Sequence, residues 1–387
     1  MWAGDARLSG SGMHGLTRVA LVYDLDACRD PTGVTRHALA QLERLACRSG
    51  IALTLLVGRM SAAEGLAYWE TLGDLTRREL PISLRNILRW WRFQPRPAVE
   101  WWTGALDWVY SPAEFFVPTK RARRAVTSHD VMQDLAYGGV RRRARLELAF
   151  RDADLVLSVS KFNTERLIEA FPHLRDRVAI VPNAADDLFF EPATERERSA
   201  VRADLGLPPG MPYLLSVANF QSRKNLSRLI RAAGRLREAA AGELAIVLLG
   251  SGAAAEADAL RAEASSLGPR AVVRLPGYRQ GRSLRAAYAE ASGLVFASLC
   301  ESFGIPTVEA MAQSCPVLLA NSTALPEVAG AAGWYFDPTR EESITSALRE
   351  MLDDGGERAR RVSAGVARAS EYRWERSNER LAAALAR

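Results

Sequence analysis

The chain has 387 residues, of which 48% are hydrophobic and 25% charged, a balance typical of a globular protein and not of a disordered or fibrous one. This length suits two domains of roughly 180 residues each. The formal net charge of +6 suits anionic partners such as nucleotides, lipid headgroups or nucleic acid, without choosing among them. Four cysteines without a C-x-x-C pair argue against a zinc ribbon and a disulfide scaffold, and favour a reducing, cytoplasmic setting.

Residues 1–15 are rich in Gly, Ser and Ala, lack the apolar stretch of a signal peptide, and are predicted to be a flexible lead-in. Short apolar runs then alternate with longer amphipathic stretches, the pattern of βαβ units around a parallel sheet. Residues 60–105 are the least regular part of the first half. A helix is predicted over about 34–48, and strands are predicted at 18–23, 52–57, 108–110, 124–127, 155–159 and 178–181.

A polar, charged stretch at 191–202 marks a predicted domain boundary near residue 192, which gives an N-terminal domain at 16–191 and a C-terminal domain at 192–371. Both domains are predicted to be α/β and doubly wound. Such folds bind ligands at the carboxyl ends of their strands, here in the crevice between the domains. Strands of the second domain are predicted at 213–217, 244–249, 272–275, 293–297, 316–320 and 333–336, with helices between them and from about 343 to the end.

The strongest chemical signal is the stretch CESFGIPTVEAMA, residues 300–312, which follows a predicted strand and opens a helix at about Thr307. A glycine-containing loop before a helix directs backbone N–H groups and a positive dipole end toward an anion. Glu301 ends the strand, Glu309 is predicted in the first helical turn, and both can accept hydrogen bonds from sugar hydroxyls. In the alternative interpretation, Glu309 only complements the helix dipole and Glu301 is a solvated loop residue. For Cys300 we favour a packing role over a nucleophilic one, since no histidine is nearby in the sequence.

Seven residues, among them Phe-Gly-Ile-Pro, separate Glu301 from Glu309. This motif resembles that of the retaining glycosyltransferases of family 4, which have the GT-B fold. That fold consists of two Rossmann-like domains facing each other across a cleft. The resemblance implies that the last helix, at 372–387, packs back on the first domain. The resemblance extends over nearly the whole chain, through the segments VANFQSRKN (217–225), STALPEV (322–328), VPN (181–183) and VTSHD (126–130).

The resemblance also implies roles for single residues, and the chemistry supports some of them independently. A nucleotide sugar breaks its C1–O bond through an oxocarbenium-like state and leaves negative charge on a diphosphate. Arg223 and Lys224 are placed to neutralise that charge, and each preorganised contact of this kind is worth roughly 2.7–4 kcal/mol of barrier. By resemblance, Glu309 holds the ribose hydroxyls of the donor, and Glu301 contacts the donor sugar near the reacting carbon.

Further donor contacts follow from the same resemblance. His129, after the strand at 124–127, is expected to hydrogen-bond the donor sugar, although a histidine beside an aspartate is also a common structural pair. Gly33, in the loop after the first strand, lets the backbone approach the diphosphate. Ala218 and Asn219 stand where the family often has Gly followed by Arg or Thr, so Asn219 is expected at the donor, and Ala184 replaces a Gly after Val-Pro-Asn. The amides of three residues are expected to line the donor sugar and phosphates: Phe303, Gly304 and Ile305.

Asp24-x-Asp26 invites a metal-binding interpretation, because such a pair holds a divalent metal on the diphosphate in a different glycosyltransferase fold. This pair follows the first strand, however, and lies far in sequence from Arg223 and Lys224. We expect no metal and no cofactor, with cationic side chains replacing the metal.

Arginines and tryptophans mix over residues 85–102, and further basic clusters follow at 120–124 and 141–145. Trp and Arg suit the headgroup zone of an anionic membrane. The alternative is that the tryptophans belong to the core and the arginines to the surface. Nucleic-acid binding is not expected, because no recognised motif accompanies these residues. No run approaches the roughly 20 apolar residues that span a bilayer, so the expectation is a cytoplasmic protein, with peripheral contact to the inner membrane face left open.

The function predicted from the sequence is that of a retaining, metal-independent hexosyltransferase. It moves a mannose- or glucose-type sugar from a nucleotide diphosphate sugar to a glycan or lipid-linked saccharide. A nucleotide-sugar epimerase or a phosphorylase of similar architecture is the alternative, and would need further acid–base residues or a cofactor lysine. A dehydrogenase would need Gly-x-Gly-x-x-Gly, and the candidate at Gly250-Ser-Gly252 lacks the third glycine. A nucleotide-sugar binding protein without catalysis would not need both Glu301 and His129.

Overall fold

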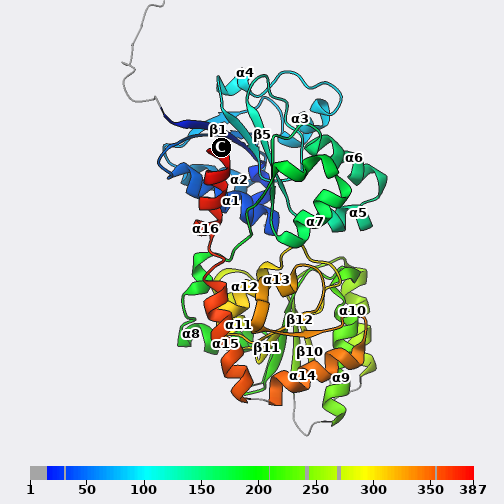
Figure 1. Cartoon of the computed structure of the whole chain (residues 1–387). Helices are drawn as coiled ribbons and strands as arrows, with labels where there is room; N and C mark the ends of the chain where they lie inside the picture. The colour runs from blue at the N-terminus through cyan, green and yellow to red at the C-terminus, as the bar shows by residue number, and fades with distance from the viewer. Residues whose placement is uncertain (1–14, 30–31, 209, 240–243, 268–271, 354) are drawn as a thin grey trace, which may run out of the picture. The chain divides into compact units, whose positions relative to one another are not determined.

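The computed structural model describes residues 15–29, 32–208, 210–239, 244–267, 272–353 and 355–387 (Figure 1). The predicted lead-in at 1–15 lies outside these residues, apart from Gly15. The chain divides into two compact units. One contains the described residues up to Thr127 with Ala144–Leu157 and Asn378–Arg387, and the other contains Ser128–Arg143 and Ser158–Ser377. The domain limits expected from the sequence, 16–191 and 192–371, stay a prediction.

The first sheet has seven strands among the described residues, in the order β3-β2-β1-β4-β5-β6-β7. The recorded registers are parallel: Leu21 of β1 pairs with Leu55 of β2 on one side and with Tyr110 of β4 on the other. The strand order therefore reverses direction between β1 and β4. The strands are β1 Thr17–Val22, β2 Ile51–Val57, β3 Thr76–Glu79, β4 Trp108–Ser111, β5 Arg123–Ser128, β6 Leu155–Ser158 and β7 Val178–Ile180.

The second sheet has six strands in the described part of the chain, in the order β10-β9-β8-β11-β12-β13. All recorded pairings in it are parallel, and here the order reverses between β8 and β11. Two parallel sheets that wind in both directions confirm the predicted doubly wound α/β class. The strands are β8 Tyr213–Val217, β9 Ala245–Leu249, β10 Val272–Gly277, β11 Gly293–Phe296, β12 Val317–Ala320 and β13 Gly333–Phe336.

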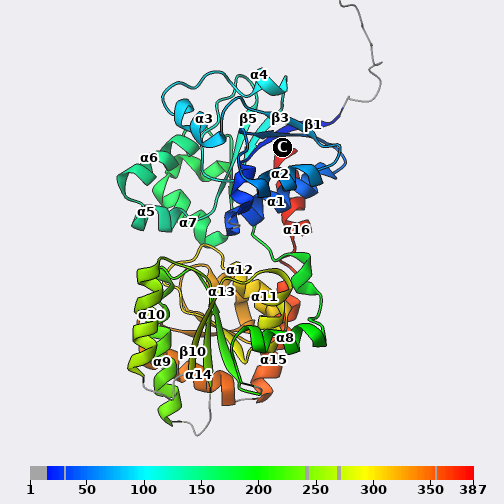
Figure 2. The ribbon, with the colours of Figure 1, turned by 180° about the vertical axis from the view of Figure 1, so that it is seen from behind.

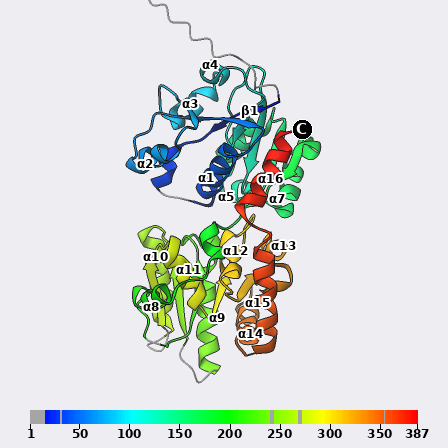
Figure 3. The same ribbon diagram turned by 90° about the vertical axis from the view of Figure 1, so that its left-hand side faces the viewer.

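Helices connect successive strands and lie on both sides of the six-stranded sheet (Figures 1 and 3). Among them, α9 packs against α10 and α14, whereas α12 packs against α11 and α15. In the described residues, no helix combines the length and apolar composition needed to cross a bilayer. The α-helices are α1 Gly33–Ala46, α2 Ala63–Thr71, α3 Leu84–Trp91, α4 Glu100–Thr103, α5 Val131–Tyr137, α6 Gly139–Phe150, α7 Lys161–Ala170, α8 Glu195–Asp204, α9 Leu226–Ala239, α10 Ala254–Ser266, α11 Gly281–Glu290, α12 Ile305–Ala312, α13 Leu325–Ala329, α14 Glu341–Asp353, α15 Gly355–Ala369 and α16 Trp374–Leu385. Short 3-10 helices are η1 Leu25–Arg29, η2 Pro172–Arg177, η3 Asp187–Phe190, η4 Ser222–Lys224 and η5 Gly330–Ala332.

The central strands follow from their apolar runs, because both faces of a parallel sheet are covered and each residue must be buried. All four residues of β4, β11 and β12 are buried. Strand β3 was not predicted, and its sequence, Thr-Arg-Arg-Glu, shows why. It is a short edge strand that pairs only with β2 and whose residues are mostly exposed, so no hydrophobic pattern marks it.

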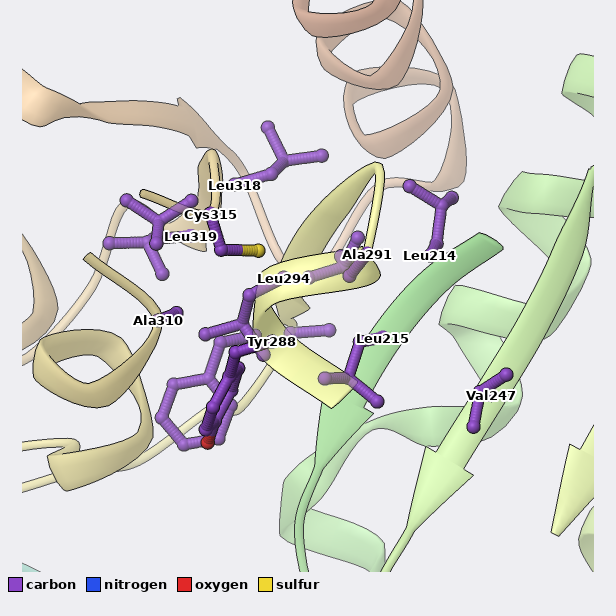
Figure 4. Close-up of a cluster of buried hydrophobic side chains, with 14 of the residues drawn as sticks. Leu214, Leu215, Val247, Tyr288, Ala291, Leu294, Ala310, Cys315, Leu318 and Leu319 are labelled. Carbon is purple, nitrogen blue, oxygen red and sulfur yellow. The ribbon is translucent and has the colours of Figure 1, made fainter. Parts of the chain in front are cut away.

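Each unit has its own hydrophobic core. In the unit with the six-stranded sheet, side chains such as Leu214, Leu294 and Leu318 of adjacent strands pack together, as Figure 4 shows. In the other unit, Val22, Leu56 and Val109 of the sheet pack with the inner faces of α3 and the segment that precedes α4. The carboxyl ends of the strands in both units carry the loops that contain the predicted site residues.

Helix α16 makes specific polar contacts with the first sheet and with α1 (Figure 2). The Trp108 indole N–H donates to the Leu385 carbonyl at 2.6 Å. Buried Asn378 accepts from Arg48 Nε at 2.9 Å, and its amide donates to Gln41 Oε1 at 3.0 Å. These bonds satisfy buried polar groups, which gives residues 378–385 of the terminal helix a defined position in the unit that contains β1.

Candidate functional site

The predicted donor residues of the second sheet gather where its strand order reverses. Strands β8 and β11 are adjacent, with Leu214 facing Gly293 and Leu215 facing Leu294. Parallel neighbours end at the same edge of a sheet, so the loops after β8 and β11 must meet there. The first loop carries Arg223 and Lys224, and the second carries Glu301.

The two cations and the carboxylate form one cluster. Lys224 Nζ and Arg223 Nη1 both approach Glu301 Oε1, the latter at 3.6 Å, and Lys224 pairs with it directly. Lys224 and Glu301 are 8% and 9% exposed, so water does not screen their attraction as it would on an open surface. The Lys224 ammonium also lies over the Phe296 ring, 5.3 Å from its centroid. The structure therefore brings together three of the predicted residues.

Backbone contacts fix the loop that carries the cations. Leu299 N–H donates to the Arg223 carbonyl at 2.8 Å, and the Arg223 guanidinium donates to the Cys300 carbonyl at 3.2 Å. Asn225 has a left-handed backbone (φ 59°), and its side-chain amide donates to the carbonyls of Ala297 and Pro338 at 3.1 and 2.8 Å. Asn tolerates this backbone better than most residues. Asn225 thus links the loop after β8 to the loop after β11 through hydrogen bonds.

Gly304 adopts φ 90° as the residue before α12, which begins at Ile305. A Cβ at Gly304 would lie 2.7 Å from a methyl group of Leu325, so both the backbone conformation and the space require glycine. Phe303 and Ile305 have buried side chains, and the Phe303 ring packs edge-on against Tyr372 at 5.3 Å. Their side chains therefore serve the core, and only their backbone amides are left for the predicted donor contacts, which stay a prediction.

The position of Glu309 differs from the expectation. Because α12 begins at Ile305 and not at Thr307, Glu309 lies in the second turn, and no acidic residue occupies the first. Glu309 is 1% exposed, and its Oε2 accepts from the hydroxyl of Tyr288, on α11, at 2.8 Å. Figure 4 draws Tyr288 among the buried side chains of this core. In this structure Glu309 is held inside the unit, and its contact with the ribose stays a prediction.

His129 lies directly after β5 and is buried. Its neighbour Asp130 accepts a hydrogen bond from the Ser302 hydroxyl at 2.6 Å, and both residues belong to the same unit. The Ser302 contact joins the loop after β11 to the segment that contains His129. The role of His129 with the donor sugar stays a prediction.

Glu327, from the segment STALPEV, caps a helix. Its carboxylate accepts from the backbone N–H groups of Lys161 and Phe162, the first two residues of α7, at 2.8 and 3.0 Å. Carboxylates at a helix N-terminus satisfy unpaired donors and complement the dipole. Glu327 therefore has a structural partner in this structure.

Two predicted residues are not part of the cluster. Asn219 follows β8 and is exposed, and no contact ties it to Glu301 among the residues described. Gly33 is the first residue of α1, after the N-cap Thr32, and belongs to the other unit. Their donor contacts stay predictions.

The structure supports the packing interpretation of Cys300. The residue is 2% exposed. Burial and the nearby carboxylates of Asp130 and Glu301 raise the pKa of its thiol to about 12, which leaves the thiol protonated and unreactive at neutral pH.

Asp26 already has partners of its own. Its carboxylate accepts from the N–H and hydroxyl of Ser61 and from the N–H of Ala62, at 2.7–3.1 Å, just before α2. Partial burial acts to raise the pKa of Asp26, but these hydrogen bonds lower it overall. Burial raises the pKa of Asp24, whose side chain accepts from the Asp26 N–H at 3.2 Å. Asp26 thus fixes the loop that leads into α2. The described residues contain no group of three or more His, Cys, Asp or Glu that could hold a metal ion.

Sequence reasoning missed Tyr288 and the structural role of Asn225. Tyr288 lies 21 residues before Glu309, within an apolar helix face that any core aromatic would occupy. The role of Asn225 could have been predicted from its position, since Asn directly before a helix often adopts a left-handed or capping conformation.

We expect Tyr288→Phe to destabilise the protein by about 1–3 kcal/mol, because it removes a donor from a buried carboxyl group. The urea midpoint, followed by tryptophan fluorescence, measures this change. Tyr335→Phe is the matched control, since its hydroxyl donates to the Gly330 carbonyl at a half-buried site and its loss should cost less. Equal shifts for both variants would show that the Glu309 contact has no special weight.

Comparisons with known proteins agree with this geometry. Residues 197–368 match the family model "Glycosyl transferases group 1". An O-antigen chain mannosyltransferase B from Escherichia coli is 27% identical over 363 residues, which cover 89% of this chain and 93% of that protein.

Solved structures show the same fold. A glycosyltransferase from Rickettsia africae is 13% identical with a TM-score of 0.74, covering 96% of this chain and 98% of that one. Anabaena HepE, solved with UDP-glucose, is 16% identical with a TM-score of 0.72, covering 95% and 99%. These findings confirm the predicted GT-B fold and the enzyme class. The chain therefore has the GT-B fold and the enzyme class of a glycosyltransferase, and its residues 197–368 match the glycosyl transferases group 1 family.

Proposed function

We propose that this glycosyltransferase moves a mannose- or glucose-type hexose from a nucleotide diphosphate sugar to a glycan or lipid-linked saccharide, with retention at the anomeric carbon and without a divalent metal. The observation that carries the proposal is the cluster of Arg223, Lys224 and Glu301 at the reversal of the strand order. Open α/β sheets bind their ligands at this place.

The two cations would stabilise the leaving group. When the C1–O bond of the donor breaks, negative charge develops on the nucleoside diphosphate, and fixed cations nearby lower the barrier. Arg223 is held through the Cys300 carbonyl and Gln221 Oε1, and Lys224 through Glu301. These contacts hold both side chains in place before the donor arrives, so that little reorganisation is needed during the reaction.

Glu301 would act in two ways. Without donor, it pairs with Lys224 and keeps a mostly buried ammonium from being left alone, which would be strongly destabilising. When the diphosphate takes over Lys224, the carboxylate is free to accept hydrogen bonds from the donor sugar and to stabilise positive charge at its reacting carbon. The diphosphate and Glu301 therefore compete for the same cation.

The sugar and acceptor are proposed from the relatives. One is named a mannosyltransferase of the O-antigen chain, and HepE was solved with UDP-glucose. Both names fit a hexose donor, and the first fits a saccharide acceptor. His129, joined to the loop after β11 through Asp130 and Ser302, would contact the donor sugar.

A panel of UDP-, GDP- and ADP-hexoses tests the function directly. We expect one nucleotide class to raise the melting temperature, because a ligand at a hundredfold excess over its Kd stabilises the native state by about 2.7 kcal/mol. Sugar release or transfer from the same donor should continue in excess EDTA. Stabilisation by none of the donors would contradict the transferase assignment, and activity that requires added Mn²⁺ would contradict metal independence alone.

Lys224→Ala should weaken binding of the donor's nucleoside diphosphate roughly 10- to 100-fold, the effect of losing one charged hydrogen bond. Binding of the bare nucleoside should change less than about twofold, since it has no phosphate for Lys224 to contact. Isothermal titration calorimetry measures both, with the exposed Lys120→Ala of the other unit as control. Equal losses for both ligands would show that Lys224 acts through folding.

Glu301→Gln should have opposite effects on binding and turnover. It removes the carboxylate that competes for Lys224, so the nucleoside diphosphate should bind as tightly as in the parent protein or more tightly. The value of kcat should fall by roughly a factor of 100, because charge stabilisation at the reacting carbon is lost. Calorimetry and initial rates check the two effects, with the exposed Glu165→Gln as control. Weaker diphosphate binding would contradict the competition of Glu301 for Lys224, and an unchanged kcat would contradict its charge stabilisation at the reacting carbon.

A further inference from the structure

One surface of the unit that contains β1 combines aromatic and basic side chains. It is formed by α3, the loop after it, the start of α4 and the turn at 120–121, all within one unit. Figures 1 and 2 show α3 and α4 at the same end of this unit. We call it the basic aromatic surface, and it consists of Ile82, Arg85, Arg89, Trp90, Arg92, Phe93, Arg96, Trp101, Lys120 and Arg121.

Helix α3 has two different faces. Leu84, Ile87 and Trp91 are buried and pack on the sheet, and the Trp91 ring meets Trp102 edge-on at 6.3 Å. The arginines at 85, 89 and 92 follow the spacing i, i+4, i+7 and are exposed, so they share the opposite face. The core thus needs only one side of this helix.

Several large apolar side chains on the outer side are left to solvent. Phe93, Trp101 and Trp90 are 88%, 80% and 54% exposed, and Ile82 is 42% exposed. The Trp90 indole N–H already donates to the Arg96 carbonyl at 3.0 Å, so its ring offers an apolar face and no free donor. Single exposed apolar residues are ordinary on a protein surface, but four within twenty residues of one segment indicate a contact surface.

The charge on this surface is positive. Residues 80–99 contain four arginines and no acidic residue. No ion pair joins any of these arginines to another residue in the part of the chain that the structure describes. Glu79 and Glu100 flank this stretch, and Glu100 is engaged by the backbone N–H groups of residues 120–122 at 2.8–3.0 Å. That contact also places Lys120 and Arg121, both exposed, against the start of α4.

We propose that the basic aromatic surface binds an anionic lipid bilayer and holds the enzyme at the membrane. Arginines attract anionic headgroups, while Trp and Phe rings enter the boundary between headgroups and acyl chains. Phe93 and Ile82 gain free energy only where they leave water, which a bilayer provides and a polar polyanion such as RNA does not. This inference uses no residue of the proposed donor site and stands apart from the donor chemistry.

Co-sedimentation of the full chain with vesicles tests the proposal. We expect binding to vesicles of phosphatidylcholine with 30% phosphatidylglycerol, weakening as salt rises, and little binding to phosphatidylcholine alone. Arg85→Glu with Arg89→Glu should lower the partition coefficient about 25-fold or more, since each basic residue at the surface contributes about a factor of five. Phe93→Ser with Trp101→Ser should also lower it, and this loss should persist at high salt.

Arg196→Glu with Arg349→Glu is the control, because it changes the net charge equally at exposed arginines of the other unit. It should leave vesicle binding within about twofold of the parent. Circular dichroism and the thermal shift with the nucleotide donor show that each variant is folded. Absence of binding to anionic vesicles would overturn the proposal, as would an equal loss in the control variant. Binding of single-stranded RNA in place of vesicles, lost in the same surface variants, would assign the surface to nucleic acid.

Discussion

Adjacent pairing of β8 and β11 is the constraint on which the proposed donor site depends. Leu214 and Gly293 face each other across this pair, and parallel neighbours must release their chains at the same edge of the sheet. Arg223, Lys224 and Glu301 therefore meet although 77 residues separate Lys224 from Glu301. Their contacts with one another are direct, but the pairing of the strands is what makes these contacts possible.

Burial gives the pair its chemical consequence. Lys224 and Glu301 are more than nine-tenths buried, and removing either partner would leave a poorly solvated charge. The loop contacts of Asn225 and Leu299 hold the cluster in place. A diphosphate that binds here would exchange one anionic partner of Lys224 for another. The free-energy cost of removing the cation from water therefore arises during folding and not during binding. For the proposed function, this exchange is the physical basis of charge stabilisation by side chains in place of a metal ion.

Burial of one face and exposure of the other explain the composition of the segment 84–102. Its apolar residues at 84, 87 and 91 complete the core of one unit, while the arginines of the opposite face have no partner that folding requires among the described residues. Exposed Phe93 and Trp101 add nothing to that core. Residues that the fold does not need are available for function, and in this segment their chemistry matches an anionic bilayer surface.

The sequence by itself determined the doubly wound α/β class and twelve of the strands, because these depend on local apolar runs. Motif spacing also determined which charged residues the donor loops carry. It missed β3, whose four polar residues form a strand only through pairing with β2. It placed Glu309 in the wrong helical turn, since Gly304 ends the loop earlier than the pattern suggested. Only the tertiary structure decided that Glu309 is buried against Tyr288 and that Lys224 pairs with Glu301. Contacts between residues distant in sequence depend on how elements pack, and no local pattern encodes that packing.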